Sequence, residues 1–344
     1  MAVPAPLLPD PRGPLSEAVI DHLRGRSSSF RQPPAAHDDP LDGDDSNLAL
    51  YLCYELHYRG FAGVAEELEW DPPLLTLRAE LERRFEERVL DEVPMATPVA
   101  DIEHEIVQAI ENAAGPSLST YMAERGTVEE MREFAIHRSA YQLKEADPHT
   151  WAIPRLFGEA KAALVAIQMD EYGYGDPAAV HATLFADTMD HLGLDSRYGA
   201  YLPLLPGSTL ATVNLMSLFG LHRRWRGALV GHFTVFEMTS VVPMGRYARA
   251  LTRLGLPEPA RRFYDVHVVA DAEHEVVALR RMAAGLARSE PDLIASILFG
   301  ANAVLRIERT FAEHMLDSWS AGISSLLPSP RPVRAPGAPV VAYS

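Results

Sequence analysis

Cysteine is almost absent from this sequence, and its scarcity excludes several kinds of site. One cysteine, Cys53, occurs among 344 residues, so the chain can form neither an internal disulfide framework nor a cysteine-rich zinc or iron–sulfur site. Long hydrophobic runs are also absent, because the most apolar stretch, residues 202–221, is interrupted by Pro203, Pro206 and several hydroxyl side chains. The N-terminus lacks the basic and apolar regions of a secretory signal.

Basic residues are in the minority. The chain has 47 acidic against 31 basic residues and a formal net charge of −16. This surplus argues against nucleic acid or an anionic membrane as a partner, because both bind clustered lysine and arginine. We therefore expect a cytoplasmic protein that binds neither nucleic acid nor membrane.

Proline is concentrated at the two ends of the chain. Eight of the 27 prolines lie in residues 1–40 and five in residues 328–339. Such segments bury too little apolar surface to offset the entropy lost on folding. We therefore predict unfolded extensions at residues 1–45 and 326–344. Residues 46–120 are expected to form an N-terminal helical portion that packs on a core made by residues 121–325.

The part of the chain between the ends has the periodicity of helices. Apolar residues from Phe263 to Leu279 recur at spacings near three and four, and residues 159–172 are rich in alanine. Alternating apolar and polar runs are scarce and no Asn-Gly hairpin signal occurs, so the predicted fold class is all-α. The expected helices span residues 46–64, 73–92, 100–113, 127–146, 152–172, 177–193, 208–222, 225–240, 243–254, 258–286 and 289–318.

The sharpest local feature is the motif His267-x3-Asp271-x2-His274. Spacings of four and three place the three side chains on one face of a helix. Two imidazoles and a carboxylate on one face can bind a divalent transition metal such as iron, manganese or zinc. Acidic residues share this helix, so a solvent-exposed polar face is the alternative interpretation, which these residues alone favour.

A second pair of candidates flanks a Gly-Tyr-Gly turn at residues 173–175. The two glycines can adopt the positive φ that ends a helix, and the Asp-Pro pair at 176–177 suits the start of the next one. Glu171 would then lie in the last turn of one helix and His181 in the second turn of the next, within reach of each other. An acidic helix end and a core histidine bonded to a carbonyl are the alternative, which the pair alone favours.

Glu237 is the third feature, because it stands among apolar residues at 235–241. A carboxylate is costly to bury unless it is paired or bound to a metal, and a side chain that faces solvent is the alternative. Three carboxylates and three histidines together are the ligand set expected of a carboxylate-bridged two-metal site. The six candidates are Glu171, His181, Glu237, His267, Asp271 and His274.

The combined spacing of these six residues resembles that of the haem-oxygenase-like diiron oxidases, also called the iron-containing redox enzyme family. The segments 141–149, 170–175 and 263–267 add to the resemblance, which covers residues 120–320. It implies a haem-oxygenase-like helical bundle with additional N-terminal helices, in which the six candidates bind two iron ions. It also implies a further carboxylate from an earlier helix, either Glu133 or Glu145, and Glu133–His137 is retained as an alternative ligand pair.

The resemblance implies an O2-dependent oxidase or oxygenase that acts on a small organic substrate, with O2 as co-substrate. An amine, amino acid or carboxylic acid would undergo N-oxygenation or oxidative C–C cleavage in natural-product metabolism, and the resemblance leaves room for an electron donor and a homodimer. A haem-binding oxygenase of the same fold and a non-catalytic helical ligand-binding protein are the alternatives. A ferritin-like diiron protein is disfavoured, because the chain contains no Glu-x-x-His motif.

Overall fold

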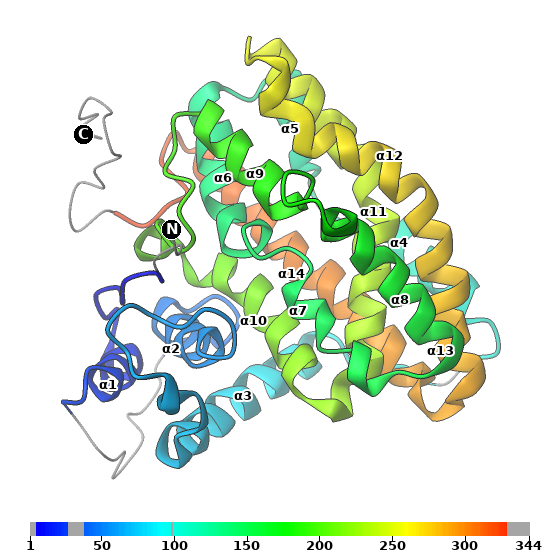
Figure 1. Ribbon diagram of the computed structural model, residues 1–344, viewed down its shortest axis with the longest axis horizontal. Helices are drawn as coiled ribbons and strands as arrows, with labels where there is room; N and C mark the ends of the chain where they lie inside the picture. Colours follow the sequence, from blue (N-terminus) through cyan, green and yellow to red (C-terminus); the bar gives the residue numbers. More distant parts are fainter. Residues whose placement is uncertain (1–4, 27–37, 98, 329–344) are drawn as a thin grey trace.

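The computed structural model describes residues 5–26, 38–97 and 99–328, and these residues form helices and connecting segments without a β-strand (Figure 1). The predicted all-α class is therefore confirmed. The helices are α1 (Pro14–Leu23), α2 (Asp44–Glu55), α3 (Pro72–Glu92), α4 (Ile102–Glu111), α5 (Leu118–Glu124), α6 (Val128–Gln142), α7 (Asp147–Thr150), α8 (Gly158–Glu171), α9 (His181–His191), α10 (Gly207–Leu221), α11 (Arg226–Arg253), α12 (Arg262–Val276), α13 (Ala284–Ser289) and α14 (Ile294–Ser320).

The long helix α11 lies at the centre of the bundle and packs against both α12 and α14. Two glycines permit the close crossing of α11 and α14, since a Cβ at Gly231 would meet the carbonyl oxygen of Ile297 and a Cβ at Gly300 would meet that of Ala228. The predicted break between residues 240 and 243 is wrong, because α11 continues through Pro243. Packing of both halves of α11 against its neighbours outweighs the cost of an interior proline, which is about 3 kcal/mol.

The helix that follows α11 is longer than an ordinary α-helix. After α12, the chain continues without interruption through a π-helical segment, Val277–Ala283, into α13. The predicted helix at 258–286 thus corresponds to four consecutive helical segments, because a short 3-10 helix, Glu258–Arg261, precedes α12. π-helical turns are uncommon and frequently occur at functional sites, and this one begins three residues after His274.

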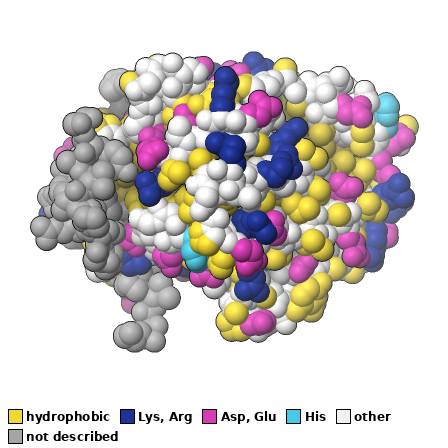
Figure 2. Space-filling model, turned by 90° about the horizontal axis from the view of Figure 1, so that it is seen from above, with side chains coloured by type: hydrophobic (Ala, Val, Ile, Leu, Met, Phe, Trp, Pro, Cys, Tyr) yellow, Lys and Arg dark blue, Asp and Glu magenta, His cyan; other side chains and the backbone are white. Residues whose placement is uncertain are grey.

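The N-terminal helices α1, α2 and α3 lie together at one side of the bundle, at the lower left of Figure 1. Helix α2 contacts α1, α3 and α10, so these three helices pack on the bundle in part through α10, whereas α4 packs on α14. In the part of the chain that the structure describes, no helix has both the length and the apolar character needed to cross a bilayer. On the face shown in Figure 2, basic side chains lie among acidic and hydrophobic ones.

The prediction that residues 1–45 are unfolded is wrong for α1. This helix buries Leu15, Val19, Ile20 and Leu23, whose spacing gives it an apolar face despite the surrounding prolines. Its first backbone N–H groups donate to Asp45, with Leu15 N and Ser16 N at 2.9 and 2.7 Å from the carboxylate oxygens. An acidic residue in the first turn of α2 therefore caps another helix. Residues 38–45 are also described and include the start of α2 at Asp44. The parts of the two extension predictions that fall on residues 1–4, 27–37 and 329–344 lie outside the described residues.

Candidate metal centre

Helix α12 presents the motif His267-x3-Asp271-x2-His274 to the interior of the bundle. The side chains of His267, Asp271 and His274 are all buried, whereas Glu273 on the same helix is exposed. The solvent-exposed alternative is therefore wrong for these three residues. Their burial makes a partner for each polar side chain necessary.

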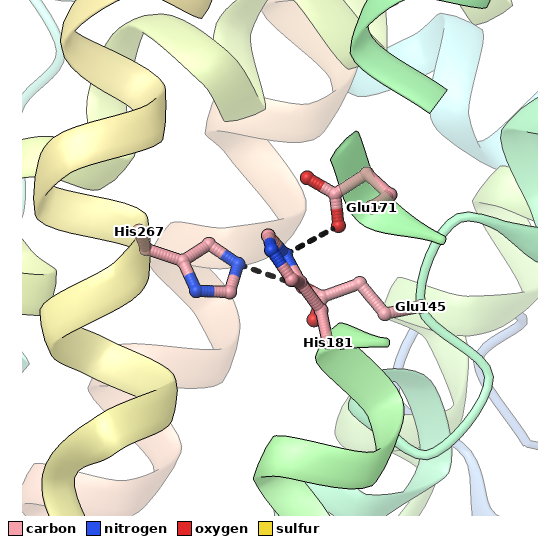
Figure 3. A group of neighbouring side chains, drawn as sticks. All are labelled: Glu145, Glu171, His181 and His267. Carbon is pink, nitrogen blue, oxygen red and sulfur yellow. Dashed lines mark ion pairs between the residues drawn. The ribbon is translucent and has the colours of Figure 1, made fainter. Parts of the chain in front are cut away.

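The first cluster joins His267 to three side chains from other elements, as Figure 3 shows. Glu171 is the last residue of α8, His181 is the first of α9, and Glu145 lies in the turn after α6. Nδ1 of His181 is 2.8 Å from Oε2 of Glu171, and Nε2 of His267 is 3.7 Å from Oε1 of Glu145. One donor atom from each of the four residues lies within 4.8 Å of all the others, which is a spacing that a single metal ion can bridge.

The second cluster shares Glu171 with the first. Donor atoms of Glu171, Asp271 and His274 lie within 4.8 Å of one another. Glu237 on α11 adjoins them, because its Oε2 is 3.3 Å from Nδ1 of His274, and Oδ1 of Asp271 is 3.4 Å from the same nitrogen. The structure thus brings all six predicted residues together with Glu145, and Glu171 belongs to both clusters.

Several polar atoms of these clusters contact only one another. Within the described residues, six buried atoms of the two clusters make no hydrogen bond, although five of them, all but Oε2 of Glu145, lie at ion-pair distance from another of the six; they are Oε2 of Glu145, Oε2 of Glu171, Nδ1 of His181, Oε2 of Glu237, Oδ1 of Asp271 and Nδ1 of His274. Buried polar atoms without partners are costly. Oxygen and imidazole nitrogen are the donors that iron, manganese and zinc accept, so these residues fit a metal centre.

Neighbouring groups orient the cluster residues. Nδ1 of His267 donates to the carbonyl oxygen of Phe263 at 2.7 Å, which leaves its Nε2 as the free donor atom towards Glu145. His274 places its Nε2 3.2 Å from Oδ2 of Asp170, with Nδ1 towards the second cluster. Such hydrogen bonds to the far nitrogen fix the ring and its tautomer in metal sites. Ser240 adds a hydrogen bond of 2.5 Å from its Oγ to Oδ2 of Asp271.

The charges of the two clusters shift one another's pKa values. Burial lowers the pKa of His267, but nearby carboxylates, Glu145 foremost, outweigh burial and raise it to about 10. Burial also opposes protonation of His274, yet Asp271 and Glu237 raise its pKa to about 10. Burial raises the pKa of Glu237 to about 8, with the charge of Asp271 adding to the shift. A cation bound here would compete with these protons directly.

The turn between Glu171 and His181 differs from its prediction. Helix α9 begins at His181 rather than at 177, so His181 lies in the first turn. The reason is that Oδ1 of Asp176 accepts from Ala178 N at 3.0 Å and closes a local turn instead of capping a helix. Helix dipoles favour negative side chains at a helix N-terminus and positive ones at a C-terminus. Glu171 at a C-terminus and a protonated His181 at an N-terminus are the reverse of this preference, so the helix ends do not explain why these two residues stand there.

The two alternatives for an extra carboxylate occupy different places. Glu145 is part of the first cluster, whereas Oε2 of Glu133 accepts from Trp319 Nε1 and Ser325 N, both at 2.9 Å. His137 is hydrogen-bonded to Thr209 and Ser325, so the structure does not bring the pair Glu133–His137 to either cluster. Asp170 and Ser240 were not predicted, and the one signal for Asp170 is its position beside Glu171.

A cavity of about 320 Å³ borders the candidate centre. Its wall includes five of the cluster residues, namely Glu145, Glu171, Glu237, His267 and Asp271. Aromatic side chains, among them Phe134, Phe236 and Phe311, form much of the remaining wall together with the ion pair of Arg138 and Glu308, whose closest N–O distance is 2.7 Å. The cavity can hold a small organic molecule in contact with the candidate centre.

Comparison with known proteins agrees with this geometry. The model of the iron-containing redox enzyme family matches residues 132–309, a span that contains both clusters and most of the cavity wall. The chain belongs to this family. Its membership of a redox-enzyme family makes it an oxidoreductase and confirms the predicted resemblance, including the haem-oxygenase-like helical bundle.

This chain is also similar to a characterised enzyme. Over 155 residues, 44% of the chain, it is 27% identical to the nitrosourea synthase of Streptomyces achromogenes subsp. streptozoticus. The match covers 32% of that synthase, so the chain spans about a third of the length of this relative.

Proposed function

We propose that this protein is an O2-dependent non-haem diiron oxidase or oxygenase that acts on a small organic substrate. The observation that carries the proposal is the position of Glu171, whose carboxylate belongs to both clusters. A carboxylate with two oxygens can bridge two metal ions that lie a few ångströms apart. Membership of an iron-containing family favours iron over manganese at both positions.

The residues divide into two sets of ligands around Glu171. We assign Glu145, His181 and His267 to the first iron, and Glu237, Asp271 and His274 to the second. Four carboxylates would match the charge of two divalent ions, provided that the three imidazoles are neutral, as metal ligands must be. The bound irons would supply the electrons for reduction of O2 next to the cavity.

The chain's own side chains would bind the substrate and exclude water. The aromatic wall shields the centre, which limits loss of a reactive oxidant to solvent. The ion pair of Arg138 and Glu308 offers the cavity both a cation and an anion, which suits an amine, an amino acid or a carboxylic acid. The name of the relative indicates chemistry at nitrogen, so we favour N-oxygenation over C–C cleavage.

A haem-binding oxygenase is a weaker explanation of the same residues. Haem needs an axial histidine in a pocket otherwise suited to a large macrocycle. Here three histidines are each paired with a carboxylate in the interior. A non-catalytic ligand-binding protein would likewise leave this buried set of carboxylates without a purpose.

Anaerobic titration of the full chain with Fe(II), followed by mixing with O2 and Mössbauer spectroscopy, tests the proposal. We expect two irons per chain, both oxidised on mixing. Asp271→Ala should lower the iron content while the helix content, measured by circular dichroism, stays unchanged. Binding of at most one iron by the folded chain would contradict the diiron assignment, and an intense Soret band on reconstitution with haem would favour the haem alternative.

A further inference from the structure

A fully buried ion pair links the N-terminal helices to the candidate metal centre. Nζ of Lys144 lies 2.9 Å from Oε2 of Glu55, the last residue of α2, and both side chains have at most 1% of their surface exposed. Helix α2 precedes the part of the chain that matches the family model, which begins at residue 132. The pair therefore joins a segment outside the family match to a residue beside Glu145.

The partners of this ion pair are tyrosines. The hydroxyl of Tyr198 donates to the same Oε2 of Glu55 at 2.7 Å. Nζ of Lys144 lies over the rings of Tyr58 and Tyr51, at 4.1 and 5.1 Å from their centroids. A cation over aromatic faces and a carboxylate with two donors are well satisfied. The ammonium of Lys144 is thus held in one place.

The turn that carries Glu145 is held at three residues on either side of it, Leu143, Lys144 and Ala146. Besides Lys144, the guanidinium of Arg59 donates to the carbonyl oxygen of Leu143 at 3.2 Å. Nε2 of Gln168 on α8 donates to the carbonyl oxygen of Ala146 at 3.1 Å. Ala146 has a φ of 74°, which a residue with a Cβ adopts only when its surroundings impose it. Glu145 lies between these restrained residues.

We propose that Glu55 and Lys144 are positioning residues for Glu145, so that the N-terminal helical portion holds one side of the metal centre. The inference rests on the proposed function, in which Glu145 is an iron ligand. A buried ion pair contributes little net stability compared with apolar residues of the same size. Its contribution here is geometric, because it fixes the turn from which the Glu145 carboxylate reaches His267.

The double variant Glu55→Gln/Lys144→Met tests the inference without leaving a buried charge unpaired. In the metal-free full chain, we expect the amides of residues 143–147 to exchange hydrogen about 10-fold faster, because the turn opens locally. The matched control is Arg226→Met/Glu290→Gln, which removes a partly buried ion pair between the start of α11 and the segment before α14. The control should leave exchange at residues 143–147 unchanged.

Fe(II) titration of the same proteins reads out the consequence for the centre. We expect the double variant to retain one iron at wild-type affinity and to bind the other about 10- to 100-fold more weakly, as Glu145→Ala should do more completely. Arg59→Met removes the hydrogen bond from an exposed side chain to the carbonyl oxygen of Leu143. It should weaken binding of the same iron by a smaller factor, and it keeps the test valid if the double variant folds poorly.

Two results would overturn the inference. One is unchanged exchange at residues 143–147 in the double variant and in Arg59→Met. The other is faster exchange with both irons bound at wild-type affinity, since Glu145 would then not depend on the pair. A wild-type chain that binds fewer than two irons would instead contradict the proposed function, so the two failures are distinguishable.

Discussion

The two halves of the candidate centre are built in opposite ways. The second cluster takes Asp271 and His274 from a single turn of α12, whereas every member of the first cluster comes from a different element. Side chains three apart on a helix are neighbours by helix geometry alone. The second cluster is therefore partly local, although Glu171 and Glu237 reach it from α8 and α11, while the first exists only once α8, α9, α12 and the turn after α6 are packed. The more local half should be the more robust to distant changes.

The shared residue gives the largest expected effect on this comparison. Glu171→Ala should remove iron from both clusters, because it deletes the one carboxylate common to them, and the iron content should fall from two per chain towards zero. Elemental analysis after anaerobic loading measures this. Glu159→Ala, an exposed carboxylate on the same helix, is the control and should retain two irons. Retention of one tightly bound iron by Glu171→Ala would argue against a bridging role.

Two single substitutions should separate the halves. Glu145→Ala should weaken the first iron and Asp271→Ala the second, so that each variant keeps about one iron per chain. Loss of a residue that only orients a metal ligand typically lowers metal affinity about 10- to 100-fold. Loss of a ligand itself should therefore lower the affinity for that iron about 100-fold or more. Mössbauer spectra of the two variants should then show different single environments. Loss of both irons in each variant would show that the halves assemble cooperatively.

A residue outside the clusters should have a smaller, one-sided effect. Asp170→Asn replaces the carboxylate beside Nε2 of His274 with a neutral amide and should weaken the second iron about 10-fold, with the first unaffected. Competition with a chelator measures the two affinities. Asp190→Asn, an exposed change on α9, is the control. An equal loss at both positions would argue that Asp170 does not act through His274.

The smallest expected effect is a pH dependence of stability in the metal-free protein. The pKa of His274 is raised from 6.5 to about 10, so its contribution to stability is present below pH 6.5 and is lost as pH rises through 10. The pKa of Glu237 is raised from 4.5 to about 8, so its contribution has the same sign and is lost as pH rises through 8. Iron bound at the proposed centre would displace these protons. Urea unfolding from pH 6 to 10 should thus show a steeper decline without iron than with it.

Much of the fold was predictable from local patterns. Helical periodicity placed α3 and α10 within one residue at each end, because their apolar spacing and flanking residues agree. Two of the errors have a common origin. Pro243 predicted a break that packing overrides, and the prolines around α1 concealed an apolar face that is stabilised by burial and by Asp45. In each case a tertiary contact outweighed a local preference.

The candidate site divides along the same line. The sequence by itself determined which donor groups are available: one cysteine excluded cysteine-rich metal sites, and the spacing of His267, Asp271 and His274 placed two imidazoles and a carboxylate on one helical face. Only the tertiary structure decided that Glu145 rather than Glu133 joins them and that Glu171 belongs to both clusters. The physical reason is the distance along the sequence over which each kind of contact is fixed. Helix geometry fixes neighbours within one turn, whereas contacts between elements depend on how whole helices pack.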